Sequence, residues 1–172
     1  METKKDEQIS LEIRHLEEND WETFKEIRLL ALQLSPEEFA SSYEEEENFH
    51  QVDWKQALKQ SEIYGAFVNT RIVGITGFFV YNYKKMEHKG MFFGMFVKPD
   101  MRGKGIGNQL MSAIIRQASK SLSQLHCMVV ASNKQALALY KKFGFEKYGT
   151  ESNGLKVGDV YYDLHLLALK LK

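Results

Sequence analysis

The sequence lacks several features on which common structural classes depend. It has one cysteine, Cys127, and two prolines in 172 residues, and no apolar run approaches the roughly 18 residues of a membrane-spanning helix. A single cysteine cannot form an intrachain disulfide, and 44% hydrophobic residues argue against a disordered chain. We therefore expect one globular domain over residues 1–172, in the reducing cytoplasm and without a membrane segment.

An excess of one charge is also missing. Lys plus Arg and Asp plus Glu both total 23, so the formal net charge is zero and no basic footprint for nucleic acid is present. Residues 1–8 are polar, lack the apolar core of a secretory signal, and are expected to be frayed. The five histidines are scattered without a close ligand pair, so we expect no metal site. Cys127 sits in an apolar run, which favours a small buried side chain over a nucleophile.

Hydrophobic periodicity predicts a mixed α/β chain. A helix follows Asn19 or Asp20, either of which can cap it, and ends near Ser35 because a proline comes next. Gly74 and Gly77 inside one strand indicate a bulge or a close backbone approach. The predicted strands cover residues 9–13, 63–68, 72–81, 91–97, 125–130, 145–150 and 161–171. Further helical segments are expected at residues 36–40, 52–58, 108–120 and 133–143.

The central stretch of the chain is residues 91–108, which read MFFGMFVKPDMRGKGIGN. The run 91–97 is apolar at both alternating sets of positions, which is typical of a strand covered on both faces. Pro99 ends it, and a glycine-rich turn then leads into a helix. Glycines leave backbone N–H groups open to a ligand, and a helix N-terminus adds partial positive charge. The turn therefore suits a phosphate or a pyrophosphate.

Glycines at such a position have two other common explanations, a tight turn that binds no ligand and a nucleotide-binding motif. Between a strand and a helix they are often only tight-turn residues. A P-loop needs Gly-Lys followed by Ser or Thr, and no such triplet occurs here. A dinucleotide fingerprint fails as well, because its last position is Asn108 or Leu110 in the two possible frames. Both nucleotide motifs are excluded.

Two motifs instead carry a resemblance to one enzyme family. Residues 102–107 read R-x-x-G-x-G directly after a strand, and residues 133–145 read N-x-x-A-x-x-x-Y-x-x-x-G-F. Both resemble the signatures of the GNAT superfamily of N-acetyltransferases. The resemblance implies a single GNAT-type α/β domain with a mixed, mostly antiparallel sheet of six to seven strands and about four flanking helices. It also implies that the sheet is splayed between the strands at 91–97 and 125–130.

The resemblance further implies acetyl-coenzyme A as co-substrate and a role for each motif residue. The phenol of Tyr140 is expected to protonate the leaving thiolate. As alternatives, Asn133 is also a good helix N-cap, and Tyr140 falls on an apolar helix face where a core tyrosine is common. The expected cofactor-binding residues are Met95, Phe96, Val97, Arg102, Gly103, Lys104, Gly105, Ile106, Gly107, Asn108, Asn133 and Tyr140.

No motif in the sequence identifies the general base or the acceptor. Many family members carry a glutamate on the strand before the loop, but residues 91–97 have no ionisable side chain. An ordered water, or Glu45, His88 or Asp163, can take that place, and the same three residues are the expected acceptor-binding residues. The acidic run 44–47 is either a solvated surface or the border of a site for a cationic amine.

Several acceptors and one other class of function stay open. The acceptor is expected to be a polyamine, amino sugar, amino acid or protein N-terminus, and the protein a monomer or homodimer. A GNAT-fold module that binds or senses coenzyme A without catalysis is the alternative. A coenzyme A release assay against amines separates the two.

Overall fold

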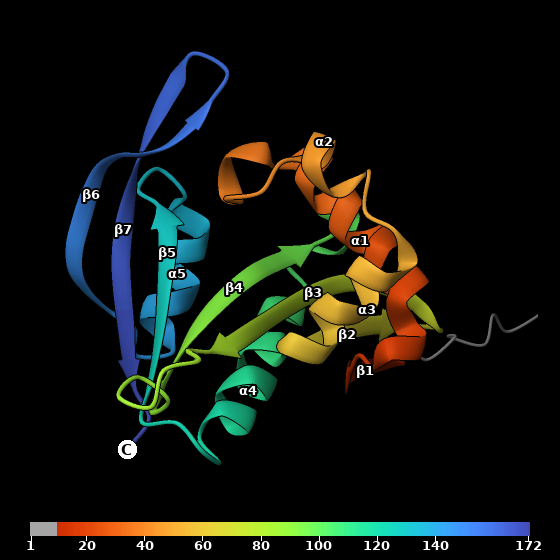
Figure 1. Cartoon of the computed structure of the whole chain (residues 1–172), viewed down its shortest axis with the longest axis horizontal. Helices are drawn as coiled ribbons and strands as arrows, with labels where there is room; N and C mark the ends of the chain where they lie inside the picture. Colours follow the sequence, from red (N-terminus) through yellow and green to blue (C-terminus); the bar gives the residue numbers. More distant parts are fainter. Residues whose placement is uncertain (1–9) are drawn as a thin grey trace, which may run out of the picture.

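A seven-stranded sheet runs through the computed structural model, which describes residues 10–172, in the order β1-β2-β3-β4-β5-β7-β6 (Figure 1). Among these residues only β4 and β5 pair in parallel; every other neighbouring pair is antiparallel. The predicted mixed, mostly antiparallel α/β sheet is confirmed, and the expected frayed residues 1–8 lie outside the described part. The strands are β1 Leu11–His15, β2 Glu62–Val68, β3 Arg71–Val80, β4 Lys89–Val97, β5 Gln124–Val130, β6 Glu146–Val157 and β7 Val160–Lys170.

Five α-helices and three short 3₁₀ turns connect the strands within residues 10–172. They are α1 Trp21–Leu34, α2 Tyr43–Glu46, α3 Gln51–Gln60, α4 Ile106–Ala118 and α5 Lys134–Lys142, with η1 Glu18–Asp20, η2 Pro36–Glu38 and η3 Pro99–Met101. Helix α4 begins two residues before the predicted start, because Gly105 takes a left-handed conformation and serves as its N-cap. In this part of the chain no helix has the length and apolar character needed to span a bilayer.

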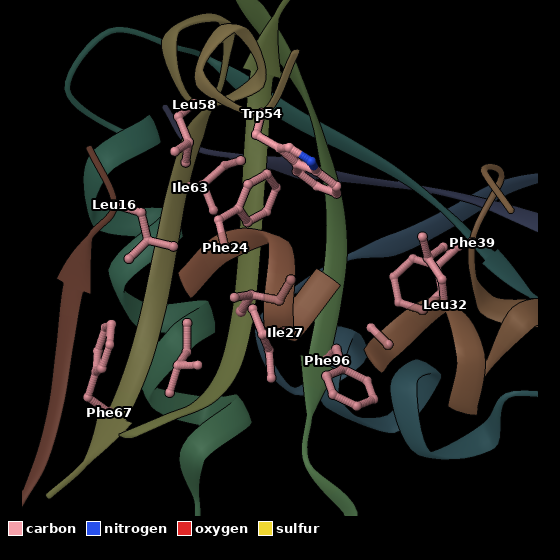
Figure 2. Close-up of a cluster of buried hydrophobic side chains, with 13 residues drawn as sticks. Leu16, Phe24, Ile27, Leu32, Phe39, Trp54, Leu58, Ile63, Phe67 and Phe96 are labelled. Carbon is pink, nitrogen blue, oxygen red and sulfur yellow. The ribbon is translucent and has the colours of Figure 1, made fainter. Parts of the chain in front are cut away.

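Helices cover both faces of the β2–β4 part of the sheet. Along β2, Ile63 and Phe67 belong to the hydrophobic cluster under α1 and α3, whereas the intervening Ala66 belongs to the cluster under α4. This alternation follows from the two-residue period of a strand. The α1–α3 side is aromatic, and the rings of Phe24 and Trp54 meet edge to face with centroids 5.6 Å apart (Figure 2).

The glycines of β3 allow neighbouring strands to approach closely, as the sequence predicted. The register of β3 against β4 shifts between Ile75 and Gly77, which marks a bulge. A Cβ atom on Gly77 would lie 3.0 Å from the carbonyl oxygen of Glu62, and one on Gly74 would lie 3.0 Å from that of Phe96. Any larger side chain at these positions would push the strands apart.

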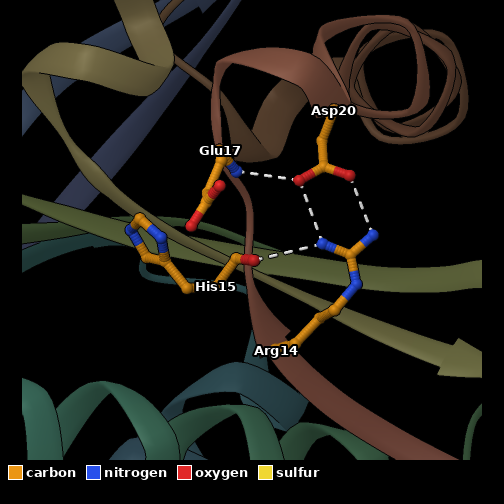
Figure 3. Close-up of polar contacts among 4 residues, drawn as sticks. All are labelled: Arg14, His15, Glu17 and Asp20. Carbon is orange, nitrogen blue, oxygen red and sulfur yellow. Dashed lines mark hydrogen bonds and ion pairs between the residues drawn. The ribbon is translucent and has the colours of Figure 1, made fainter.

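The junction between β1 and α1 differs from the expected cap. Asp20 precedes α1, but its carboxylate accepts hydrogen bonds from Arg14 at 2.8 and 2.9 Å and from the backbone N–H of Glu17 at 2.8 Å (Figure 3). The Arg14 guanidinium lowers the pKa of Asp20 below its ordinary value. Asp20 therefore ties the helix start back to β1 and does not cap α1 through its side chain.

Three strand predictions need correction. The continuous apolar run 125–130 also predicts a strand buried on both faces. The structure differs, because Met128 is 49% exposed where β5 diverges from β4. β4 likewise has only half-buried residues at Met91, Phe93 and Met95. In addition, β6 is longer than predicted, since its outer half pairs with β7 beyond a register shift between Glu151 and Leu155.

The acidic run 44–47 is not uniformly solvated. The side chain of Glu46 is buried and accepts two hydrogen bonds from Arg28 of α1, at 2.7 and 2.9 Å. Arg28 is also buried and lies over the ring of Phe39 at 5.0 Å from the centroid. This bidentate pair joins α2 to α1, whereas Glu44 remains exposed as expected for a charge run.

We predict that Glu46→Ala lowers the free energy of unfolding by about 3–5 kcal/mol, because it leaves the Arg28 guanidinium buried without its counter-charge. Urea denaturation followed by circular dichroism measures the change. Glu44→Ala is the matched control on the same helix and is expected to stay within about 0.5 kcal/mol of the native protein. Equal losses in the two variants would contradict a stabilising role for the buried pair.

Candidate functional site

The candidate site lies where β4 and β5 separate. The two strands pair only from Lys89 to Met91 on β4 and from Gln124 to His126 on β5. Beyond Met91, the edge of β4 that faces β5 has no ladder partner. The predicted splay between these strands is therefore confirmed. Backbone N–H and C=O groups along that edge are free to bind an extended ligand.

A bulge in β4 lies beside this gap. Phe93 pairs with Gly77 and Phe96 with Ile75, so Gly94 and the next residue stand opposite Thr76 alone. Gly94 has φ +69, a left-handed conformation that favours glycine. The hydroxyl of Thr76 donates to the carbonyl oxygen of Phe93 at 3.2 Å and supports the bulge from β3.

A cavity of about 460 Å³ occupies the gap between the strands and continues to the start of α4. Of the predicted cofactor-binding residues, only Lys104 does not line it. Glu45, His88 and Asp163, the predicted acceptor residues, do not line it. The predicted residues in its wall are Met95, Phe96, Val97, Arg102, Gly103, Gly105, Ile106, Gly107, Asn108, Asn133 and Tyr140.

The glycine-rich turn forms an open cradle at one end of the cavity. Gly103 and Gly105 have φ +75 and +77, and a Cβ atom on either would meet no protein atom within 4 Å. Ile106, the first residue of α4, is buried and anchors the start of the helix. The first N–H groups of a helix have no partner within it, so those at this N-terminus are available to a ligand in the cradle. The cradle therefore suits an anion.

Two cations stand beside the cradle. Arg102 folds back so that its Nε donates to the carbonyl oxygen of Val97 at 3.0 Å. Lys142, at the end of α5, donates to the side-chain oxygen of Asn108 at 2.7 Å and lines the cavity. Lys142 was not predicted as a site residue, because nothing in the sequence places it next to a residue 34 positions earlier.

Asn133 has two partners in this structure. Its side-chain oxygen accepts from the N–H of Ala136 at 3.0 Å, which confirms the predicted N-cap of α5. Its side-chain nitrogen donates to Glu38 at 2.8 Å. Because the cap fixes the amide, the nitrogen is directed at Glu38 and the cavity wall.

Tyr140 lies two helical turns further along α5. It is buried, 7% exposed, and its ring packs edge to face against Phe92 with centroids 5.3 Å apart. Burial raises the pKa of its phenol far above the ordinary value, and the nearby Cys127 and Glu38 raise the pKa further. The phenol is therefore protonated at neutral pH and can act as a proton donor.

Glu38 is a second site residue, besides Lys142, that the sequence did not predict. It ends the 3₁₀ turn η2, lines the cavity, and precedes its partner Asn133 by 95 positions in the chain. Glu38 is exposed on the cavity rim, but the protein around its carboxylate still removes part of the hydration, which raises the pKa of Glu38. The charge of Glu37 raises this pKa further, and Arg102 lowers it. The only signal in the sequence was the proline that starts this turn.

The three predicted acceptor residues have other contacts. Glu45 accepts from the backbone N–H of Ser42 in a capping box at the start of α2. Asp163 accepts from the N–H of Asn153 in the irregular part of β6. The backbone oxygen of His88 accepts from Ser123. Each contact lies outside the cavity wall.

Cys127 and the histidines form no second reactive centre among residues 10–172. Cys127 is buried, and burial raises the pKa of its thiol to about 12, so the thiolate is scarce at neutral pH. This agrees with its predicted role as a small buried side chain. No group of three or more His, Cys, Asp or Glu side chains suited to a metal ion occurs in the described residues.

Comparisons with known proteins agree with the fold and the motifs. A family model described as acetyltransferase (GNAT) family matches residues 20–145. Thialysine N-epsilon-acetyltransferase of Bos taurus is 32% identical over 80 residues, which are 45% of this chain and 46% of the bovine protein. The match thus spans about half the length of that relative.

Two further proteins cover more of the chain. The ribosomal protein bS18-alanine N-acetyltransferase of Escherichia coli strain K12 is 27% identical over 142 residues, 80% of this chain and 95% of that protein. The structure of yncA from Salmonella typhimurium with its cofactor acetyl-CoA has a TM-score of 0.81 at 18% identity and covers 95% of each chain. Because the family model matches most of the sequence, the chain belongs to the acetyltransferase (GNAT) family.

Proposed function

We propose that this protein is an acetyl-coenzyme A dependent N-acetyltransferase that moves an acetyl group to a primary amine. The observation that carries the proposal is one continuous cavity, which joins the gap between β4 and β5 to the glycine cradle at α4. An elongated ligand with a pyrophosphate at one end and a thioester at the other matches that shape. An extended arm can pair with the free edge of β4.

The residues of the cavity fit the cofactor at both ends. Backbone N–H groups from Gly103 to Asn108 would hold the pyrophosphate, with Arg102 and Lys142 adding positive charge. Backbone groups of residues 95–97 would pair with the pantetheine arm, and Asn133 would contact it from α5. The open space beside Gly103 and Gly105 supports this assignment, because nothing in the protein fills the cradle.

Bound acetyl-coenzyme A supplies an activated acetyl thioester. Within the protein, the N–H of Met95 would stabilise the oxygen that becomes negative as the amine attacks. A carbon–nitrogen bond then forms as the carbon–sulfur bond breaks. Tyr140 donates its phenolic proton to the departing sulfur, and the proton released from the new amide nitrogen restores the phenol. No covalent protein intermediate is needed.

The relatives support an amine as acceptor. The bovine relative is named for thialysine and the Escherichia coli relative for the alanine of a ribosomal protein, and both names specify N-acetyl transfer. A structure of similar fold contains acetyl-CoA. The cytoplasmic location, the single domain over residues 1–172, the lack of a metal or nucleic-acid partner and the monomeric or homodimeric state stay predictions.

We expect Gly105→Ala to weaken binding of acetyl-coenzyme A roughly tenfold, the worth of one hydrogen bond to a charged group, because the new methyl group enters the cradle. Isothermal titration calorimetry measures the affinity. Gly158→Ala is the control for backbone strain, since Gly158 also has positive φ and open space but lies in the β6–β7 turn. In both variants the free energy of unfolding should fall by about 1–2 kcal/mol, because alanine is strained at positive φ. An affinity loss of the same size in both would argue against the cradle.

Tyr140→Phe is expected to lower kcat about a hundredfold or more, because the variant loses its proton donor and keeps the ring that packs against Phe92. Coenzyme A release with a panel of primary amines measures the rate. Acetyl-coenzyme A affinity and thermal stability should stay close to native values. Tyr161→Phe, on an exposed tyrosine of β7, is the control. Unchanged turnover in Tyr140→Phe would remove Tyr140 from the mechanism.

The same assay tests the alternative of a coenzyme A sensor. A sensor binds acetyl-coenzyme A and releases no coenzyme A with any amine. Turnover of one amine by the native protein would exclude a purely sensing role.

A further inference from the structure

The proposed reaction needs a group that takes a proton from the amine, and β4 offers none. At neutral pH a primary amine is mostly an ammonium ion, which has no lone pair for attack. Residues 91–97 have no ionisable side chain, and no member of the acidic run 44–47 lines the cavity. The carboxylate that does line it belongs to Glu38.

The fold anchors Glu38 from several sides. Pro36 starts η2, and Phe39, directly after Glu38, is buried beneath the Arg28 guanidinium. Arg28 is itself held by Glu46 through two hydrogen bonds. These contacts position the turn without using the Glu38 side chain. Its carboxylate is therefore free to face the cavity.

The anchor also reaches the bulge of β4. A nitrogen of Arg28, Nη1, lies 3.6 Å from the position that a Cβ atom on Gly94 would take. Helix α1, and η2 directly after it, therefore lie close to the Gly94 bulge of β4. The thioester would lie beside this bulge. Because Glu46 neutralises Arg28, this approach adds little net positive charge that would repel an ammonium ion.

Four polar groups interact with the Glu38 carboxylate. Asn133 donates to it at 2.8 Å and fixes its orientation. Arg102 acts on it from the cradle and Glu37 from its own turn, with opposite effects on its pKa. Tyr140 is close enough for Glu38 to raise the pKa of the phenol. A proton acceptor and a proton donor therefore line the same cavity.

Resting on the proposed transferase function, we propose that Glu38 binds the acceptor as an ammonium ion and removes its proton, so that the acceptor is a cationic primary amine. The ammonium N–H bond breaks, its electron pair stays on nitrogen, and the carboxylate becomes a carboxylic acid. The neutral amine then attacks the thioester. Glu38 passes the proton to solvent, which accounts for the single proton released when an ammonium ion becomes an amide.

Glu38→Gln tests this role. Glutamine keeps the size of the side chain and an oxygen that can accept from Asn133, but it has no charge and cannot take the proton. The probes are spermidine, L-lysine, glucosamine and a short peptide with a free N-terminal alanine. Coenzyme A release is measured from neutral to alkaline pH, and acetyl-coenzyme A affinity is measured separately by calorimetry. Glu44→Gln removes one exposed charge of the same connecting segment and is the matched control.

We expect Glu38→Gln to lower kcat/KM for the preferred amine about a hundredfold at pH 7, with the affinity for acetyl-coenzyme A unchanged. The loss should shrink as the pH rises, because an increasing fraction of the amine is then already neutral. Glu44→Gln should match the native protein throughout.

The measurements distinguish a failure of the proposed transferase function from a failure of the proposed role of Glu38. If the native protein binds acetyl-coenzyme A but releases no coenzyme A with any of the four probes, the proposed transferase function is overturned together with this inference. If the native protein turns over an amine and Glu38→Gln does so equally well, only the role of Glu38 is overturned. If Glu38→Gln lowers kcat/KM by the same factor at every pH, the effect is structural, and the role of Glu38 in proton removal is also overturned.

Discussion

The short parallel ladder between β4 and β5 controls the shape of the sheet and of the site within it. Its three paired positions, ending at Met91 and His126, keep the two parts of the sheet together. Beyond them, the bulge at Gly94 and the lost pairing open a gap. A longer ladder would close the cavity, and no ladder would separate the halves. The apolar contacts of Phe92 with Tyr140 and Phe145 hold the strands at this separation.

Parallel pairing also explains why two distant motifs meet. Two parallel strands end at the same edge of a sheet, so the segments that follow them lie side by side. The cradle with α4 follows β4, and Asn133 with α5 follows β5. The contact between Lys142 and Asn108 joins the two helices across the site. The geometry of the cavity is therefore a consequence of strand direction.

The connection between α1 and β2 supplies the carboxylate that residues 91–97 of β4 lack. Its first turn brings Glu38 to the cavity, and the buried pair of Arg28 with Glu46 holds the surrounding segment against α1. An acidic run that reads as solvated surface thus contains one residue that stabilises the fold. The acidic residue that reaches the cavity lies several positions earlier. Only contacts with α1 and α5 distinguish these carboxylates from one another.

The α/β class and most strand positions follow from the letters of the chain, because periodicity, glycine placement and capping are local properties. The family was predicted in another way, from the resemblance of two motifs to GNAT signatures. Those motifs made Gly103, Gly105, Asn133 and Tyr140 candidate site residues, and all four line the cavity. The folded chain was needed to show that β4 and β5 stop pairing after Met91 and His126, that Lys142 joins the cradle, and that Glu38 lines the cavity. These facts depend on contacts between residues far apart in the chain, and side-chain burial and charge at such contacts leave no local pattern in the sequence.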